Sequence, residues 1–172
     1  MMQESLLQRL DRRDRALFAR WSIGSDVGRS LRGGWTLLTH VGGAMATIAF
    51  AVLPLAVDGA LRSAALHALA TLILSHVAVQ MLKRSIGRPR PSRSIARRAL
   101  VHEPDRFSFP SGHAAAAMSV AVAYSMAFPS LAGPLCLVAG AVGLSRVCLG
   151  VHYPGDVFVA QLIAVATAIV LA

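Results

Sequence analysis

Charge, and acidic charge above all, is scarce in this sequence. Only 15% of its residues are charged, whereas a soluble globular domain carries roughly a quarter, and 8 Asp and Glu stand against 17 Lys and Arg. Aromatic residues make up 6% and hydrophobic residues 55%, so most of the apolar mass lies in small and aliphatic side chains. This composition excludes an ordinary soluble domain and indicates closely packed membrane helices.

Cysteine is scarcer still, and the placement of the two cysteines excludes two further features. Cys136 and Cys148 lie in one apolar stretch, and their spacing would separate them by about 18 Å on a helix, too far for a disulfide. Neither has the spacing of a metal ligand, so both are expected to be small core residues. Residues 1–22 contain no apolar stretch followed by a small-residue cleavage site, so we expect no cleavable signal peptide.

The N-terminal segment has the pattern of an amphipathic helix. Residues 5–21 place Leu10, Phe18 and Trp21 at helical spacing, with several arginines between them. The segment is too charged to cross a bilayer, which predicts a helix that lies in the membrane interface. The alternative is a helix that packs on the rest of the protein.

Beyond this segment, long uncharged runs predict membrane-spanning helices. We expect five of them, over residues 35–57, 64–82, 112–128, 131–149 and 154–172. The expected fold is therefore all-α, an integral membrane bundle of about five transmembrane helices plus an N-terminal amphipathic interfacial helix. Residues 1–34 are assigned to the interfacial segment and residues 35–172 to the membrane-embedded core.

Three polar clusters interrupt the apolar runs, each at the end of a predicted helix. They cover residues 83–91, 110–113 and 145–156. An alternating path of five spans places all three on one face of the membrane. The long polar insert over 83–110 falls on the same face, and loops of this length in a compact domain are usually functional or disordered.

The residue types in these clusters indicate phosphate binding. Lys83, Arg90 and Arg146 supply positive charge, and arginine presents a planar fork of donors that matches phosphate oxygens. Ser111 and Gly112 stand at the start of a predicted helix, where a hydroxyl and free N–H groups meet the positive end of the helix dipole. Taken singly, Ser111 could be a plain N-cap and the arginines could be topology signals.

Two histidines and one carboxylate complete a candidate reaction centre. A carboxylate of Asp156 bonded to one ring nitrogen of His152 would fix its tautomer and leave the other nitrogen as a nucleophile. His113 is then free to protonate the leaving oxygen. Asp156 alone could equally be a first-turn carboxylate that the helix dipole favours.

The other polar residues have simpler interpretations. His40, His67 and His76 fall inside predicted spans without a motif, which favours packing or a buried hydrogen bond. Two acids, Glu103 and Asp105, lie with His102 in the long insert and are expected to be solvated or gating residues.

At these clusters the sequence resembles the type 2 phosphatidic acid phosphatase superfamily, which includes glucose-6-phosphatase and the vanadium haloperoxidases. The family pattern is K-x6-R-P, then P-S-G-H, then S-R-x5-H-x3-D, and every fixed position is matched, by Lys83, Arg90, Pro91, Pro110, Ser111, Gly112, His113, Ser145, Arg146, His152 and Asp156. The resemblance implies a phosphohistidine on His152, oriented by Asp156, with His113 as general acid. It further implies that phosphate is held by Lys83, Arg90, Ser111, Gly112 and Arg146, with no metal and no cofactor.

The expected function is hydrolysis of a terminal phosphate from a lipid whose tail stays in the bilayer. The motifs do not distinguish phosphatidate, phosphatidylglycerol phosphate, a polyprenyl diphosphate or a prenyl-linked sugar phosphate. Vanadate-dependent halide oxidation and a non-catalytic transport or scaffold role are the alternatives from other classes. The expected partners are a lipid phosphate and the bilayer, with no nucleic acid, and the oligomeric state stays open.

The distribution of basic residues predicts which face carries the site. With five spans, 16 of the 17 Lys and Arg lie on the face of the three clusters and only Arg62 lies on the other. Without the three cations assigned to phosphate, the ratio is still 13 to 1. Because cytoplasmic loops are enriched in Lys and Arg, we expect the site to face the cytoplasm, in a bacterial inner membrane.

Overall fold

The protein is a bundle of helices, as the apolar runs predict. The computed structural model describes residues 6–95 and 98–172, so residues 1–5 of the predicted N-terminal segment lie outside the described residues. Within them the elements are α1 (Leu6–Trp21), α2 (Arg29–Val41), α3 (Ala44–Val52), η1 (Leu53–Ala56), α4 (Ala60–Ile86), α5 (Pro91–Ser94), α6 (Gly112–Ala127), η2 (Pro129–Leu131), α7 (Ala132–Cys148) and α8 (Pro154–Val170). The described chain forms no β-strand, only an isolated bridge between Pro89 and Phe107. The all-α prediction is confirmed.

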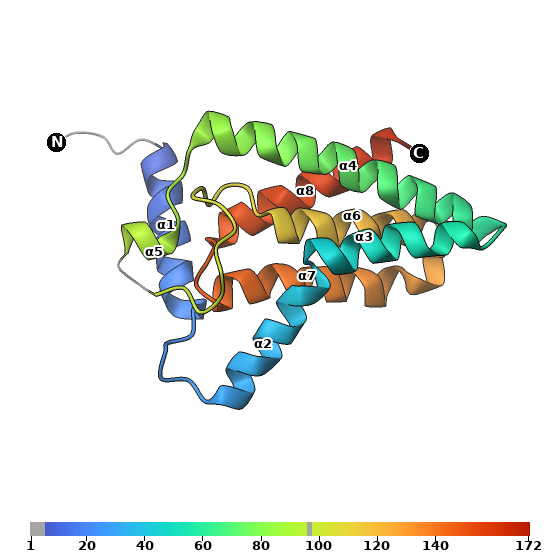
Figure 1. Cartoon of the computed structure of the whole chain (residues 1–172). Helices are drawn as coiled ribbons and strands as arrows, with labels where there is room; N and C mark the ends of the chain where they lie inside the picture. The colour runs from blue at the N-terminus through green and yellow to red at the C-terminus, as the bar shows by residue number, and fades with distance from the viewer. Residues whose placement is uncertain (1–5, 96–97) are drawn as a thin grey trace.

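Helix α6 is the centre of the bundle and packs against α4, α7 and α8 (Figure 1). It has only 16 residues, and its buried positions are small, among them Ala114, Ala117 and Ala121. Small side chains allow helix backbones to approach closely. The contact between α7 and α8 also requires a small residue, because a Cβ at Gly143 of α7 would lie 2.5 Å from Cγ1 of Val157 in α8.

The first predicted span is not one straight helix. Residues 35–57 are predicted to form one span, but α2 ends at Val41 and α3 begins after a bend of 42°. Gly42 lies at this break, and a Cβ there would be 2.3 Å from Cγ1 of Val142 and 3.0 Å from the carbonyl oxygen of His113. The break therefore fits tightly against α6 and α7, beside the start of α6.

The number of spans stays a prediction. Helix α4 and the stretch Pro129–Cys148 are long and apolar enough to cross a membrane, and the bent α2–α3 pair is a third if it counts as one span. Helix α8 is a shorter apolar helix. The boundary predicted at residue 34 falls inside α2. The cysteines differ from expectation at one position, since both are free but Cys136 is exposed and only Cys148 is buried.

Helix α1 lies across one end of the bundle (Figure 1). Phe18 is buried and meets the ring of Tyr153 edge-on at 5.3 Å between centroids. Leu10, Leu17 and Trp21 remain exposed. Packing on the bundle, which the sequence left as the alternative, is thus observed for one side of α1, and the exposed apolar side chains remain available to a membrane interface.

Candidate active site

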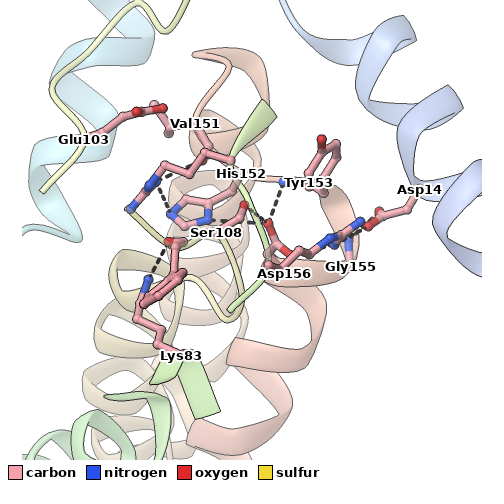
Figure 2. A network of polar contacts seen from close by, with 12 residues as sticks. Asp14, Lys83, Glu103, Ser108, Val151, His152, Tyr153, Gly155 and Asp156 are labelled. Atoms are coloured by element: carbon pink, nitrogen blue, oxygen red, sulfur yellow. Dashed lines mark hydrogen bonds and ion pairs between the residues drawn. The ribbon is translucent and has the colours of Figure 1, made fainter. Parts of the chain in front are cut away.

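The three polar clusters meet at one end of the bundle, as the alternating path predicts. Arg90 of the first cluster donates to the carbonyl of Val151 at 2.9 Å and to Nε2 of His152 at 3.3 Å, both in the third cluster. The backbone N–H of Ser111 in the second cluster donates to the carbonyl of Asp156 at 3.0 Å. Figure 2 shows Lys83, His152 and Asp156 in one continuous network.

Three cations at this end of the bundle are almost completely buried. Lys83 is 3% exposed, Arg90 is fully buried and Arg146 is 2% exposed. Arg146 donates through Nη1 to Oγ1 of Thr39 at 2.8 Å, but its Nε and Nη2 have no hydrogen-bond partner among the described residues. A buried cation with unused donors is costly unless an anion binds it. Burial and unused donors distinguish Arg146 from a solvent-exposed topology signal.

Ser111 is not a plain N-cap. It stands at the N-cap position of α6, yet its side chain makes no capping hydrogen bond, and its buried Oγ has no partner among the described residues. The next residue, Gly112, lines a cavity, and a Cβ added there would meet no atom within 4 Å beyond its chain neighbours and its own helix backbone. The start of α6 thus has an unused buried hydroxyl next to a residue that lines the cavity, at the positive end of a helix dipole.

Asp105, predicted as a solvated or gating residue, is partly exposed but also pairs with two cations of the site. Its carboxylate lies 3.2 Å from Nζ of Lys83 and 3.0 Å from Nη2 of Arg90. Burial raises the pKa of Asp105, but these two cations outweigh it and hold the pKa below its usual value. Glu103 also has a partner, the hydroxyl of Ser92 at 2.8 Å, whereas His102 is exposed as expected.

His152 is buried between the arginines and Asp156. Burial lowers its pKa to about 4, opposed by Asp156 and assisted by Arg146 and Arg90, so the ring is neutral near pH 7. Because Arg90 donates to Nε2, that nitrogen carries a lone pair and the proton belongs on Nδ1. Nδ1 lies 3.6 Å from Oδ2 of Asp156, longer than a hydrogen bond, and no described atom bonds it.

Asp156 is held by other groups as well. Its Oδ2 accepts from the backbone N–H of Tyr153 at 2.8 Å and from the hydroxyl of Ser108. Its Oδ1 accepts from Nη1 of Arg88 at 2.7 Å. The bond to Tyr153 is part of a capping box at the start of α8, so the first-turn interpretation of Asp156 holds together with its position beside His152.

His113, the second residue of α6, lines a cavity of about 750 Å³ together with His152. The same cavity reaches the cations Lys83 and Arg90. It continues between α3 and α4 along a mostly apolar wall, formed by Ala44, Thr47, Ile48, Leu69, Leu72, Ile73, His76, Val77 and Gln80. The reaction centre is therefore continuous with a space suited to an apolar chain.

Several contributors are not fixed positions of the motifs and were missed in the sequence. Thr39 carries no signal, because its contact with Arg146 depends on the bend after α2. Ser108 lies two residues before the second cluster and reaches Asp156 only because the insert folds back. Arg88 lies inside the first cluster, but the sequence does not show its carboxylate partners. No group of three or more His, Cys, Asp or Glu suited to a metal occurs among the described residues.

The fold and the site define a membrane-embedded helical protein with a cation-lined pocket around two histidines. The profile of the PAP2 superfamily matches residues 64–172, the stretch that holds all three clusters. The chain belongs to this superfamily, which confirms the resemblance seen in the motifs.

Two curated relatives are similar over part of the chain. Decaprenylphosphoryl-5-phosphoribose phosphatase of Mycolicibacterium smegmatis is 42% identical over 87 residues, covering 49% of this chain and 45% of the relative. Lipid A 1-phosphatase of Rhizobium etli is 31% identical over 99 residues, covering 51% and 40%. The match thus spans less than half the length of either relative.

Two solved structures are similar over nearly the whole chain. The transmembrane PAP2-type phosphatidylglycerolphosphate phosphatase from Bacillus subtilis has a TM-score of 0.77 at 25% identity, covering 95% of this chain and 84% of that chain. Aquifex aeolicus LpxE has a TM-score of 0.76 at 25% identity, covering 91% and 92%. The bundle therefore has the fold of membrane PAP2 phosphatases.

Proposed function

We propose that this protein is a membrane-embedded lipid phosphate phosphatase that works through a phosphohistidine and needs no metal ion. One observation carries the proposal. The unused buried donors of Arg146 and Ser111 lie in the same site as a neutral, buried His152. A tetrahedral phosphate beside an apolar tail fits such donors together with the neighbouring cavity, which is lined by Lys83, Arg90, His113 and His152.

In the first step, Nε2 of His152 attacks phosphorus and the bond to the leaving oxygen breaks. The electron pair of that bond goes to the leaving oxygen, which takes a proton from His113. The phosphate dianion favours the protonated form of His113 before the step. Lys83, Arg90 and Arg146 balance the charge on the three equatorial oxygens, a role that a metal ion plays elsewhere.

In the second step, water attacks the phosphorus of the phosphohistidine and the bond to Nε2 breaks. The neutral His113 accepts the proton of that water, and phosphate is released. Throughout, the carboxylate of Asp156 stabilises the proton on Nδ1 of His152. As positive charge develops on the ring, Oδ2 of Asp156 moves closer to Nδ1 than the 3.6 Å of the free protein.

Phosphate release from lipid phosphates in detergent tests the mechanism. His152→Ala should abolish turnover, and His113→Ala should slow it by about a hundredfold or more. His102→Ala is the matched control, because this exposed histidine lies outside the site and its loss should leave the rate unchanged. A His152→Ala protein with near wild-type turnover would contradict the phosphohistidine.

The substrate we propose carries a hydroxylated unit, a sugar or glycerol, between its terminal phosphate and its tail. Gln80 and His76 line the cavity about 5 and 10 Å along α4 from Lys83. Nε2 of Gln80 and Nε2 of His76 lie 3.3 Å apart. Two polar side chains in a mostly apolar wall can form hydrogen bonds with the hydroxyl groups of such a unit. The names of two relatives, for a phosphoribose and a phosphatidylglycerolphosphate, contain units of this kind. A polyprenyl diphosphate is the runner-up.

A substrate panel separates the two. We expect the highest kcat/KM for prenyl-linked sugar phosphate or phosphatidylglycerol phosphate, and a KM increase of about tenfold for these lipids in His76→Leu or Gln80→Leu, as for one lost hydrogen bond. Farnesyl diphosphate, which lacks the unit, should be unaffected by either variant. Equal effects on all lipids would contradict the assignment.

We further propose that the site faces the cytoplasm, because basic residues are in excess at its end of the bundle and cytoplasmic loops are enriched in Lys and Arg. In a protein with Cys136 and Cys148 replaced by Ser, single cysteines at His102 and Asp58 report on opposite ends. In intact cells, an impermeant maleimide should label Cys at position 58 and not at position 102. Labelling at position 102 alone would reverse the orientation.

A further inference from the structure

Helix α1 reaches the proposed reaction centre through a chain of ion pairs. Arg88 lies between Asp156 and α1, and its Nη1 is 2.7 Å from Oδ1 of Asp156 and 2.7 Å from Oδ2 of Asp14. Its Nη2 is 2.8 Å from Oδ1 of Asp11. In Figure 2, Asp156 lies between His152 on one side and Asp14 of α1 on the other.

This connection is shielded from water. The side chain of Asp156 is fully buried, that of Asp14 is 14% exposed and that of Arg88 is 18% exposed. Burial lowers the pKa of Arg88, but the two carboxylates outweigh it and raise the pKa above its ordinary value. The guanidinium also lies over the ring of Tyr153, 4.1 Å from its centroid, so the bridge is charged and confined.

A second contact ties α1 to the residue before Asp156. The backbone N–H of Gly155 donates to Oδ1 of Asp14 at 2.7 Å. A Cβ at Gly155 would lie 2.9 Å from Oδ2 of Asp14, so a larger residue would displace the carboxylate. Asp14 therefore holds both the backbone and, through Arg88, the side chain at the first turn of α8.

The position of Asp156 matters because its separation from His152 is marginal. Oδ2 is 3.6 Å from Nδ1, and a movement of well under 1 Å decides whether a hydrogen bond forms. Tyr153 and Ser108 hold Oδ2, while Arg88 alone among the described residues holds Oδ1. The rotation of the carboxylate, and hence the aim of Oδ2, depends on Arg88.

We propose that Asp14 and Arg88 are positioning residues, through which helix α1 fixes the carboxylate of Asp156 and thereby the ring of His152. The inference rests on the proposed phosphatase function. Asp14 lies outside the region that matches the superfamily profile, because α1 precedes residue 64.

The test compares steady-state kinetics of variants on a short-chain, water-soluble lipid phosphate. Asp14→Asn should lower kcat about five- to tenfold and Arg88→Met about a hundredfold, each with less than a twofold change in KM. Arg88→Lys, which keeps the charge, should recover part of the loss. Asp26→Asn and Arg84→Met are the matched controls, since both residues are exposed, and they should keep wild-type kcat.

A double-mutant cycle separates positioning from a merely structural role. If Asp14 acts through Asp156, then Asp14→Asn should cause no further loss in an Asp156→Asn background. Multiplied losses, or wild-type kcat in both Asp14→Asn and Arg88→Met, would overturn the inference while leaving the phosphatase proposal intact.

A second measurement does not need turnover and also detects misfolding. The ¹⁵N resonances of His152, assigned by comparison with His152→Gln, should shift toward a mixture of tautomers in Asp14→Asn and Arg88→Met, and stay unchanged in Arg84→Met. Unchanged resonances in all variants would overturn the inference. A wild-type protein that releases no phosphate from any lipid, but shows these shifts, would contradict the proposed function alone.

Discussion

Replacing Ser111 by Ala should separate phosphate binding from folding. The hydroxyl is buried and bonds no described atom, so its removal breaks no hydrogen bond of the free protein. A hydrogen bond to a charged group contributes about 1.5–3 kcal/mol, and kcat/KM should therefore fall about 10- to 150-fold. The free energy of unfolding should stay equal or rise, since an unsatisfied buried hydroxyl is itself costly.

The assay measures kcat/KM for phosphate release together with the thermal midpoint in one detergent. Thr71→Val is the matched control, because Oγ1 of Thr71 is likewise buried without a described partner, in α4 about 18 Å from Lys83. It should leave kcat/KM unchanged. Ser108→Ala, which loses a bond to Asp156, should lower both quantities. Wild-type kcat/KM in Ser111→Ala, or a lowered midpoint there, would refute the reasoning.

Three further expectations concern the charges of the site. Activity should survive EDTA, and orthovanadate should inhibit as a mimic of five-coordinate phosphorus, whereas a strict requirement for Mg²⁺ would contradict the role given to the cations. As pH falls through about 4, protonation of His152 should remove the nucleophile, and kcat/KM should therefore fall. The titration of the substrate's own phosphate is measured by ³¹P NMR and corrected for. A decrease centred near pH 6.5 would contradict a buried, neutral ring. Asp105→Asn should lower the inhibition constant of orthovanadate about fivefold. The carboxylate of Asp105 competes with the anion for Lys83 and Arg90, in ion pairs worth about 1 kcal/mol. An increased inhibition constant would show that Asp105 orients the cations instead.

The sequence was informative where a short stretch of chain determines the structure. Uncharged runs predicted α4, α6, α7 and α8 within about four residues, and the spacing of the motifs placed His113 and His152 at one end of the bundle. It was less informative where two distant segments must meet. The break at Gly42 depends on close packing against Val142, and a pair of glycines in an apolar run does not distinguish a break from a close helix contact.

Long-range pairing explains the missed site residues as well. Asp14 and Asp105 have no motif around them, and their ion pairs are with arginines 74 and 15 residues away in the chain. The sequence supplied the charges of the site but not the pairing between them, because many arrangements of 17 basic and 8 acidic residues are compatible with the same motifs.

The shortness of α6 has a consequence for which phosphates can react. Its 16 residues rise about 24 Å, less than the roughly 30 Å of a bilayer's hydrocarbon core. If α6 stands upright with its C-terminal end level with the opposite headgroups, Ser111, Gly112 and His113 at its start lie below the headgroups on the side of the site, while the 27-residue α4 is long enough to cross the core. A phosphate ester would in that case have to leave the aqueous layer to be hydrolysed. Depth in the membrane would then discriminate against soluble metabolites, whatever their shape, and an anchoring tail would be the means of entry.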